Sequence, residues 1–334
     1  MKAAPSSLSH IRAVNQLAQI LGCSATWDDV VRAIDAERAK PSDAWAKRCL
    51  EGIETILVDD GLDGKDEVHD YTWHDRLTRS KCKRIVRIEK VAEDLIMKCI
   101  KRNEIPPDEL YTSVIHEFEK AIKAAALDPE VVGFKSVICY RTGLNISSGP
   151  FTAAEMEPEF VELLSRIDAE GVIRIDRNDG GQINDYLVHK TASIIQSTPG
   201  HKKPFQFHTG LGDNDITLTT SSPSHLQNFI RQYPKVPIVL LHASYPWTKE
   251  AGYLASVYEN VYADVGEVFP FLSKQGQENV IREILELCPT EKILWSTDGH
   301  WFPETYLLAI IQVREALEVV RNLSLTFKFH GLKI

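Results

Sequence analysis

The chain alternates short apolar runs with longer segments in which apolar residues recur at helical spacing. Each apolar run ends in polar residues or glycine, which is typical of a buried strand that leads into a loop. Seven such runs are predicted to contain strands, within residues 55–61, 84–100, 131–143, 203–213, 236–246, 260–270 and 292–301. Helical periodicity separates several of them, as in "SPSHLQNFIRQYP" (222–234) and "SKQGQENVIREILELCP" (273–289). The pattern therefore predicts strands and helices in alternation.

The first fifty residues have only the helical pattern. Ser7 and Thr26 are suited to cap helices, because a hydroxyl can accept a hydrogen bond from the first turn. The first helix is predicted to end at Gly22, and a third short helix is expected within "DAWAKRCLEGI" (43–53). We therefore expect a helical segment over 1–50, a barrel over 51–320 and an atypical tail over 321–334.

Alternating strands and helices indicate an α/β fold with a parallel sheet that is covered by helices. Seven strands are one fewer than a closed (β/α)8 barrel of the TIM type requires. An open seven-stranded sheet is the competing interpretation, and periodicity does not separate the two.

Composition narrows the classes of function. The chain has 334 residues, of which 43% are hydrophobic and 25% charged, and its formal net charge is -9. These values are ordinary for a globular protein, and the absence of a basic cluster argues against a nucleic-acid partner. We expect no membrane segment, since no apolar stretch reaches about 18 residues, and no signal peptide. The six cysteines are scattered, so we expect reduced thiols and a cytoplasmic location.

Residues able to bind a metal or transfer a proton stand where predicted strands end. His208 closes "PFQFH", His242 closes "PIVLLH", and Asp298 follows "ILWST". Strand ends on one face of a barrel converge, so such residues can surround one ion. Imidazole and carboxylate groups suit zinc. Lys135, in "VVGFKSVICY", either joins this group or extends to solvent.

The succession of motifs resembles the metal-dependent amidohydrolase superfamily, whose fold is a distorted (β/α)8 barrel. It is similar in particular to the amidohydrolase half of the fungal FluG family, which joins such a barrel to a C-terminal glutamine-synthetase-like domain. The motifs are "RCLEGIETILVDDGL", "YTWHDRL", "GFKSVICYRTGL", "PFQFHTGLGD", "LLHASYPW", "VYADVGEV" and "ILWSTDGHWFPE".

The resemblance implies a role for each strand-end residue. His208 and His242 match the metal-binding histidines of the family's fifth and sixth strands. Asp298 matches the aspartate of the eighth strand, which is both a ligand and a proton shuttle. Lys135 falls on the fourth strand, where some relatives carry a carbamylated lysine. The implied cofactor is a divalent metal, with zinc as the first choice.

The sequence contains no His-x-His, the motif with which the family's first strand ends. We therefore expect a barrel with a gap between the strands at 55–60 and 292–297. Without those two histidines we expect weak metal occupancy and little or no turnover. The tail "RNLSLTFKFHGLKI" does not match the family, and we expect no glutamine-synthetase-like domain after it.

Further candidates lie near the strand ends. His74, Tyr140 and His300 are placed to contact a small-molecule substrate, and Arg141 is placed to bind a substrate carboxylate bidentately. A polar loop contact for His74 and a surface ion pair for Arg141 are equally compatible with the sequence. Asp264 and Glu267 are expected to be structural, and Glu304 has no assigned role.

Three functions remain open. The first is hydrolysis of a C–N bond in a small amide, with Asp298 moving the proton to the leaving amine. The second is a metal-dependent decarboxylation, a reaction known from related barrels. The third is a non-catalytic role in binding or regulation. The sequence leaves the state of oligomerisation open, a homo-oligomer included.

Overall fold

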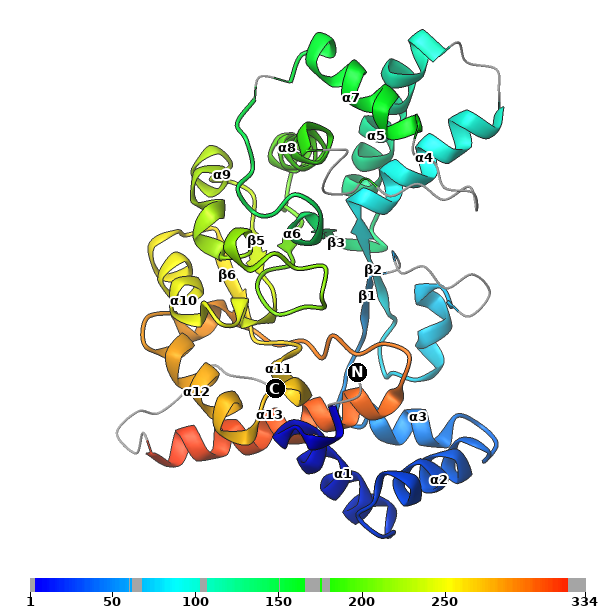
Figure 1. The fold of residues 1–334 in the computed structure, drawn as a ribbon, viewed down its shortest axis with the longest axis vertical. Helices are drawn as coiled ribbons and strands as arrows, with labels where there is room; N and C mark the ends of the chain where they lie inside the picture. Colours follow the sequence, from blue (N-terminus) through cyan, green and yellow to red (C-terminus); the bar gives the residue numbers. More distant parts are fainter. Residues whose placement is uncertain are drawn as a thin grey trace.

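In the computed structural model a seven-stranded parallel sheet forms the centre of the protein (Figure 1). The structure describes residues 4–59, 61, 68–102, 107–149, 151–165, 175 and 181–323. The strands are β1 (Leu57–Asp59), β2 (Lys83–Arg87), β3 (Val131–Ser136), β4 (Phe205–Phe207), β5 (Ile238–Leu240), β6 (Val261–Asp264) and β7 (Ile293–Leu294). They neighbour one another in the order of the sequence. The α/β prediction is confirmed.

Helices follow most of the strands. They are α4 (Ile88–Arg102), α5 (Pro107–Leu127), α6 (Ile138–Arg141), α7 (Ala153–Ser165), α8 (Gly181–Ser197), α9 (Gln227–Gln232), α10 (Thr248–Val257), α11 (Val268–Phe271), α12 (Lys274–Leu285) and α13 (Pro303–Leu323). None of the helices in the described part of the chain is long and apolar enough to cross a membrane.

Alternation along each strand separates the two faces of the sheet. Phe134, Phe205, Ile238 and Val261 are partners in register, are buried, and belong to the core that packs against the helices. Their neighbours Lys135, Gln206 and Val239 are also in register and line a cavity on the inner side. The sheet therefore has one face for the core and one face for a site.

The sheet is curled into an open barrel, and β1 and β7 are its edges. Among the described residues, each of these two strands pairs with one neighbour only, β1 with β2 and β7 with β6. The predicted gap between the strands at 55–60 and 292–297 is therefore confirmed. Both edge strands are shorter than the apolar runs that predicted them.

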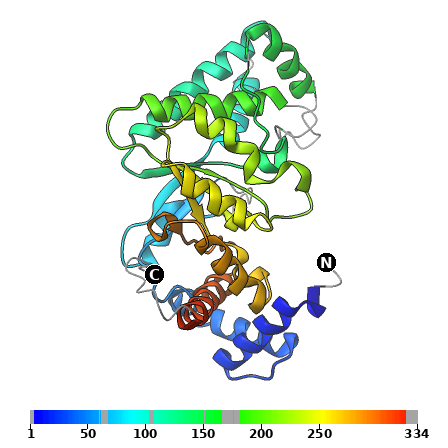
Figure 2. The same cartoon turned by 90° about the vertical axis from the view of Figure 1, so that its left-hand side faces the viewer.

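Three N-terminal helices precede the sheet: α1 (Leu8–Leu21), α2 (Trp27–Arg38) and α3 (Ala44–Cys49). Ser7 and Thr26 cap α1 and α2 as predicted, and Gly22 ends α1 in a left-handed conformation. Both views show these helices beside α13, the helix that follows β7 (Figures 1 and 2). Val14, Leu17, Ala18, Val30 and Ile34 form a small core with Leu308 of α13. Most of the predicted tail, 324–334, lies outside the described residues.

Candidate metal centre

A cavity of about 1210 Å³ opens at the carboxyl ends of the strands. Every residue that the sequence singled out for chemistry lines it, namely His74, Lys135, Tyr140, Arg141, His208, His242, Asp298 and His300. The fold brings these residues together because the ends of parallel strands meet at one edge of a sheet.

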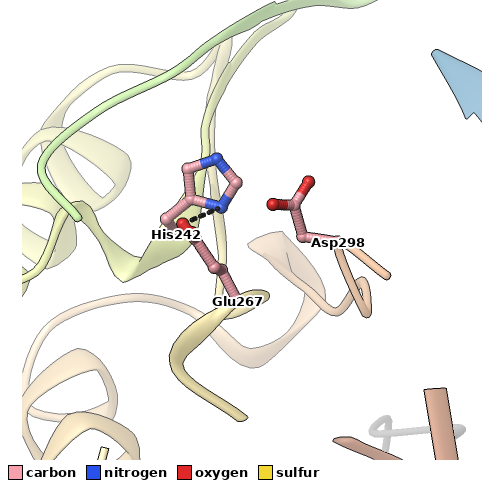
Figure 3. A group of neighbouring side chains, drawn as sticks. All are labelled: His242, Glu267 and Asp298. Atoms are coloured by element: carbon pink, nitrogen blue, oxygen red, sulfur yellow. Dashed lines mark ion pairs between the residues drawn. The ribbon is translucent and has the colours of Figure 1, made fainter. Parts of the chain in front are cut away.

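His242, Glu267 and Asp298 form the tightest group in this cavity (Figure 3). One potential ligand atom from each lies within 4.8 Å of the others, a spacing at which the three could hold a cation. The three residues follow β5, β6 and β7, which are neighbours in the sheet. The sequence expectation for Glu267 was a structural role, but its Oε2 lies 3.3 Å from Nδ1 of His242 and faces the site.

His208 follows β4 and lies beside this group, with its ring centroid 4.4 Å from that of His242. Tyr140 also lies beside His208, at 4.2 Å between ring centroids. His208 and His242 are buried, and Nε2 of each has no hydrogen-bond partner among the described residues. Two buried imidazole nitrogens without a partner fit a metal ion, because such atoms normally find a ligand or a hydrogen bond.

The protonation of these groups also suits a cation. Burial lowers the pKa of His208 and His242 well below the usual value, and the positive charge of Lys135 lowers both further. Both imidazoles are therefore neutral near pH 7, which is the form that binds metals. Burial, with the nearby charge of Asp298, raises the pKa of Glu267 to about 8.

The backbone at all three clustered residues lies in the left-handed region, with φ of 62° at His242, 57° at Glu267 and 48° at Asp298. Ala243 and Ser244 continue the left-handed turn after His242. Non-glycine residues rarely adopt this conformation, and it concentrates at functional sites where surrounding contacts hold it.

Asp264 supplies one of those contacts. Its Oδ2 accepts hydrogen bonds from the backbone N–H of His242 (3.3 Å) and of Gly266 (2.9 Å) and from the hydroxyl of Ser296 (3.1 Å). It therefore ties together the ends of β5, β6 and β7. This position agrees with the structural role expected from the sequence. Burial raises the pKa of Asp264 to about 6, although these hydrogen bonds oppose the increase.

An ion-pair network at the ends of β1, β2 and β3 lines the same cavity. Asp59, at the end of β1, pairs with Arg87 of β2 and with Lys135 of β3, whose Nζ is 3.1 Å from Oδ2. Burial favours a raised pKa for Asp59, but the two cations outweigh it and hold the pKa at about 2. Arg141 lies 3.9 Å from Glu93. The wall of the cavity near β2 and β3 therefore carries three cations, each of which faces a carboxylate.

The remaining candidates lie toward the mouth of the cavity. Nδ1 of His74 is 3.1 Å from the carbonyl oxygen of Asp70, and Nδ1 of His300 is 3.0 Å from that of Asp298. Phe271, Trp301 and Phe302 line the same mouth and are more than half exposed, at 57%, 51% and 56%. The mouth is thus suited to a ligand with a planar or apolar part.

Sequence reasoning missed one member of the group. Glu267 lies three residues after the last residue of β6, and only the turn at its positive φ directs it into the cavity. The signal that was available is the same one that identified the others: "ADVGE" places acidic residues directly after an apolar strand.

Comparison with known proteins shows similarity in sequence and in fold. The chain is 44% identical over 328 residues to protein fluG of Emericella nidulans, which covers 95% of this chain and 38% of fluG. The chain therefore spans less than two fifths of that relative. A crystal structure from Lactobacillus casei, described as a metal-dependent hydrolase, is 25% identical with a TM-score of 0.77, and the match covers 98% of this chain and 80% of that one.

More distant structures share the fold alone. A uronate isomerase from Bacillus halodurans is 14% identical with a TM-score of 0.62, over 99% of this chain and 73% of its own. The amidohydrolase family model matches residues 148–330, which contain His208, His242, Glu267 and Asp298. With this match over more than half of its length, the chain belongs to the amidohydrolase family.

Proposed function

We propose that this protein is a metal-dependent hydrolase that cleaves the C–N bond of a small amide. The observation that supports it most is the convergence of one imidazole and two carboxylates within 4.8 Å, at the ends of three neighbouring strands. The expected metal is zinc, because the donors are imidazole nitrogen and carboxylate oxygen.

His242, Glu267 and Asp298 would hold the metal, with His208 beside them. When bound, the metal supplies Lewis acidity toward a carbonyl oxygen and toward water. Lys135 could join the ligands only by leaving Asp59, so we assign it to the cationic wall of the cavity rather than to the metal. Glu267 takes the place among the ligands that the sequence left open.

The protein's own residues perform the proton transfers and the binding. Asp298 accepts a proton from the attacking water and delivers it to the leaving nitrogen, so that an amide and water become an acid and an amine. Arg141 binds a carboxylate of the substrate, and Tyr140 donates a hydrogen bond from its hydroxyl. Burial raises the pKa of Tyr140 far above neutral, so its hydroxyl keeps its proton. His74 and His300 contact the substrate at the mouth.

The test measures bound metal by elemental analysis and released amine with a panel of small N-acyl compounds. The expectation of weak occupancy did not count Glu267, which adds a carboxylate to the group. We therefore expect one divalent ion per chain, and we expect His242→Asn and Asp298→Asn to abolish amine release. His201→Asn is the matched control, because His201 is exposed and precedes β4 instead of following it. A purified protein without metal, which releases no amine even after zinc is added, would exclude the proposal.

The cationic wall and the aromatic mouth favour a second candidate, the decarboxylation of an aromatic or unsaturated acid. Arg141, which lies 3.9 Å from Glu93, would bind an acidic group, and Trp301 and Phe302 would contact the planar part. Carbon dioxide and amine are different products. Measuring both with the same panel of substrates decides between the two reactions.

A further inference from the structure

We propose that Glu304 is a positioning residue for Asp298, and that Arg38 and Trp45 of the N-terminal helices hold it in place. The N-terminal helical segment would then help to set the geometry of the candidate metal centre. This inference rests on the proposed function in one respect, the assignment of Asp298 as a metal ligand.

Glu304 lies in the first turn of α13 and is buried, with 6% of its surface exposed. Its Oε1 accepts a hydrogen bond of 2.5 Å from the indole N–H of Trp45, and its Oε2 accepts one of 2.6 Å from Arg38. Hydrogen bonds to an ionised group are stronger than neutral ones. A buried carboxylate with two such donors therefore fixes the start of α13 against α2 and α3.

A series of short contacts connects this anchor to Asp298. The hydroxyl of Thr305 donates to the carbonyl of Phe302 (2.7 Å), and the N–H of Phe302 donates to the carbonyl of His300 (2.6 Å). Nδ1 of His300 in turn lies 3.0 Å from the carbonyl oxygen of Asp298. The guanidinium of Arg38 also lies 5.5 Å from the ring centroid of Phe302.

The loop formed by residues 298–302 packs closely against the first turn of α13. A Cβ added at Gly299 would lie 2.4 Å from the ring of Tyr306 and 3.0 Å from the hydroxyl of Thr305. Asp298 and Trp301, at φ of 48° and 62°, hold left-handed conformations that the chain does not favour on its own. The loop keeps this path because the helix beneath it is fixed, and Glu304 fixes that helix.

The test compares Glu304→Gln with Glu315→Gln. Glu315 lies on the same helix and also accepts hydrogen bonds from the N-terminal segment, from Arg12 and from Gln16. It is about 16 Å farther along the axis, at about 1.5 Å per residue. Both variants weaken the attachment of the N-terminal helices, but only Glu304→Gln does so beside the loop of Asp298.

Each variant is characterised by two measurements. The first is the affinity for Co²⁺ and the visible spectrum of the cobalt-loaded protein. We expect Glu304→Gln to lower the affinity about 10- to 100-fold, the usual effect of removing a partner that orients a ligand, and to change the spectrum. The second is amide hydrogen exchange of residues 298–302 in the metal-free protein, which we expect to become faster. Glu315→Gln should leave both unchanged.

The two measurements separate this inference from the proposed function. Absence of Co²⁺ binding by the wild-type protein would overturn the metal site itself. Unchanged exchange of 298–302 in Glu304→Gln, or an equal change in Glu315→Gln, would overturn the role of Glu304. Arg38→Gln keeps the test decisive if Glu304→Gln does not fold. Arg38 is partly exposed, and its loss should change exchange and affinity in the same direction by a smaller amount.

Discussion

At the scale of single residues, burial and the charged partners together decide the protonation of each buried carboxylate. Asp59 and Glu267 line the same cavity and both are largely buried. Asp59 contacts two cations, which hold its pKa at about 2 despite burial. Glu267 is buried near the negative charge of Asp298, and its pKa rises to about 8. At neutral pH the carboxylate of Asp59 is therefore ionised, whereas the carboxyl group of Glu267 carries a proton.

The protonation of Glu267 predicts how metal affinity depends on pH. Below about pH 8 a proton occupies this carboxylate in the metal-free protein, and a metal must displace it. We therefore expect the affinity for Zn²⁺ to rise about tenfold per pH unit up to about pH 8 and then to level off. Chelator competition between pH 6 and 9 measures this. Glu267→Gln should bind more weakly and with a smaller slope, so equal slopes would contradict the assignment.

A second residue-scale prediction concerns stability. Burial raises the pKa of Asp185 to about 6, although its carboxylate accepts the N–H of Ser147 at 2.9 Å. Because the folded-state pKa lies above the unfolded value, the native protein loses stability as the pH rises from about 4 to about 6. We expect Asp185→Asn to be more stable than the wild type at pH 8 by about 1 to 3 kcal/mol, since one pKa unit corresponds to about 1.4 kcal/mol.

The difference in stability between Asp185→Asn and the wild type should disappear below pH 4, where the wild-type carboxyl group of Asp185 is neutral in both the folded and the unfolded state. Urea unfolding at the two pH values checks it. Asp94→Asn is the control, because the side chain of Asp94 is 65% exposed. A variant of Asp185 that is less stable than the wild type at pH 8 would show that the ionised form is the favoured one.

At the scale of elements, the turns after the strands place the site. His242, Ala243 and Ser244 form a left-handed turn after β5. Thr209, from the loop after β4, donates a hydrogen bond of 2.6 Å to the carbonyl of Leu241 and shares one of 2.7 Å with the hydroxyl of Ser244. Neighbouring turns therefore support one another, and a change in one is expected to move the next.

Gly210 provides a test of this contact between turns. Its φ is +66°, and a Cβ there would lie 2.3 Å from the carbonyl oxygen of Tyr245. We expect Gly210→Ala to cost about 2 to 4 kcal/mol, adding overpacking to the backbone penalty, and to weaken metal binding by shifting His242. Gly200 is the matched control: its φ is +78°, but nothing lies within 4 Å of an added Cβ. Gly200→Ala should cost about 1 kcal/mol. Equal losses in unfolding experiments would show that the turns are independent.

The sequence predicts elements better than it predicts turns. The apolar run "PIVLL" identified β5, and the residue directly after it, His242, lies in the cavity as a strand-end residue should. The sequence did not identify Glu267 as a member of the group, because a strand pattern carries no information about the backbone angles of the turn that follows the strand. The run at 292–297 predicted a longer strand than the two residues of β7, since apolar content marks burial and not ladder pairing.

At the scale of the whole molecule, the curled sheet has two free edges among its described residues. Leu57 of β1 is 50% exposed and Leu294 of β7 is 40% exposed. Unpaired strand edges with exposed apolar side chains promote association, and natural proteins often protect them with lysine. The edges of the barrel are therefore a surface on which this protein is expected to self-associate.

Lysine at the edges tests this expectation. We expect Leu57→Lys and Leu294→Lys to reduce concentration-dependent association in sedimentation velocity, with little change in unfolding temperature because both side chains are partly exposed. Leu127→Lys is the control, since Leu127 is 70% exposed at the end of α5, away from both edges. If all three variants associate equally, exposed apolar surface in general is responsible.

The packing of α1 and α2 on α13 has a consequence for synthesis. The apolar face of α1 and α2 leaves the ribosome long before its partner, because Leu308 emerges almost three hundred residues later. At a synthesis rate of about 5 to 20 residues per second, that face remains exposed for about 15 to 60 s before Leu308 is made. We expect ribosome-arrested chains that stop before α13 to be cleaved by protease within α1 and α2, and chains that include α13 to resist. These two helices would then be made before the sheet but become protected only after it.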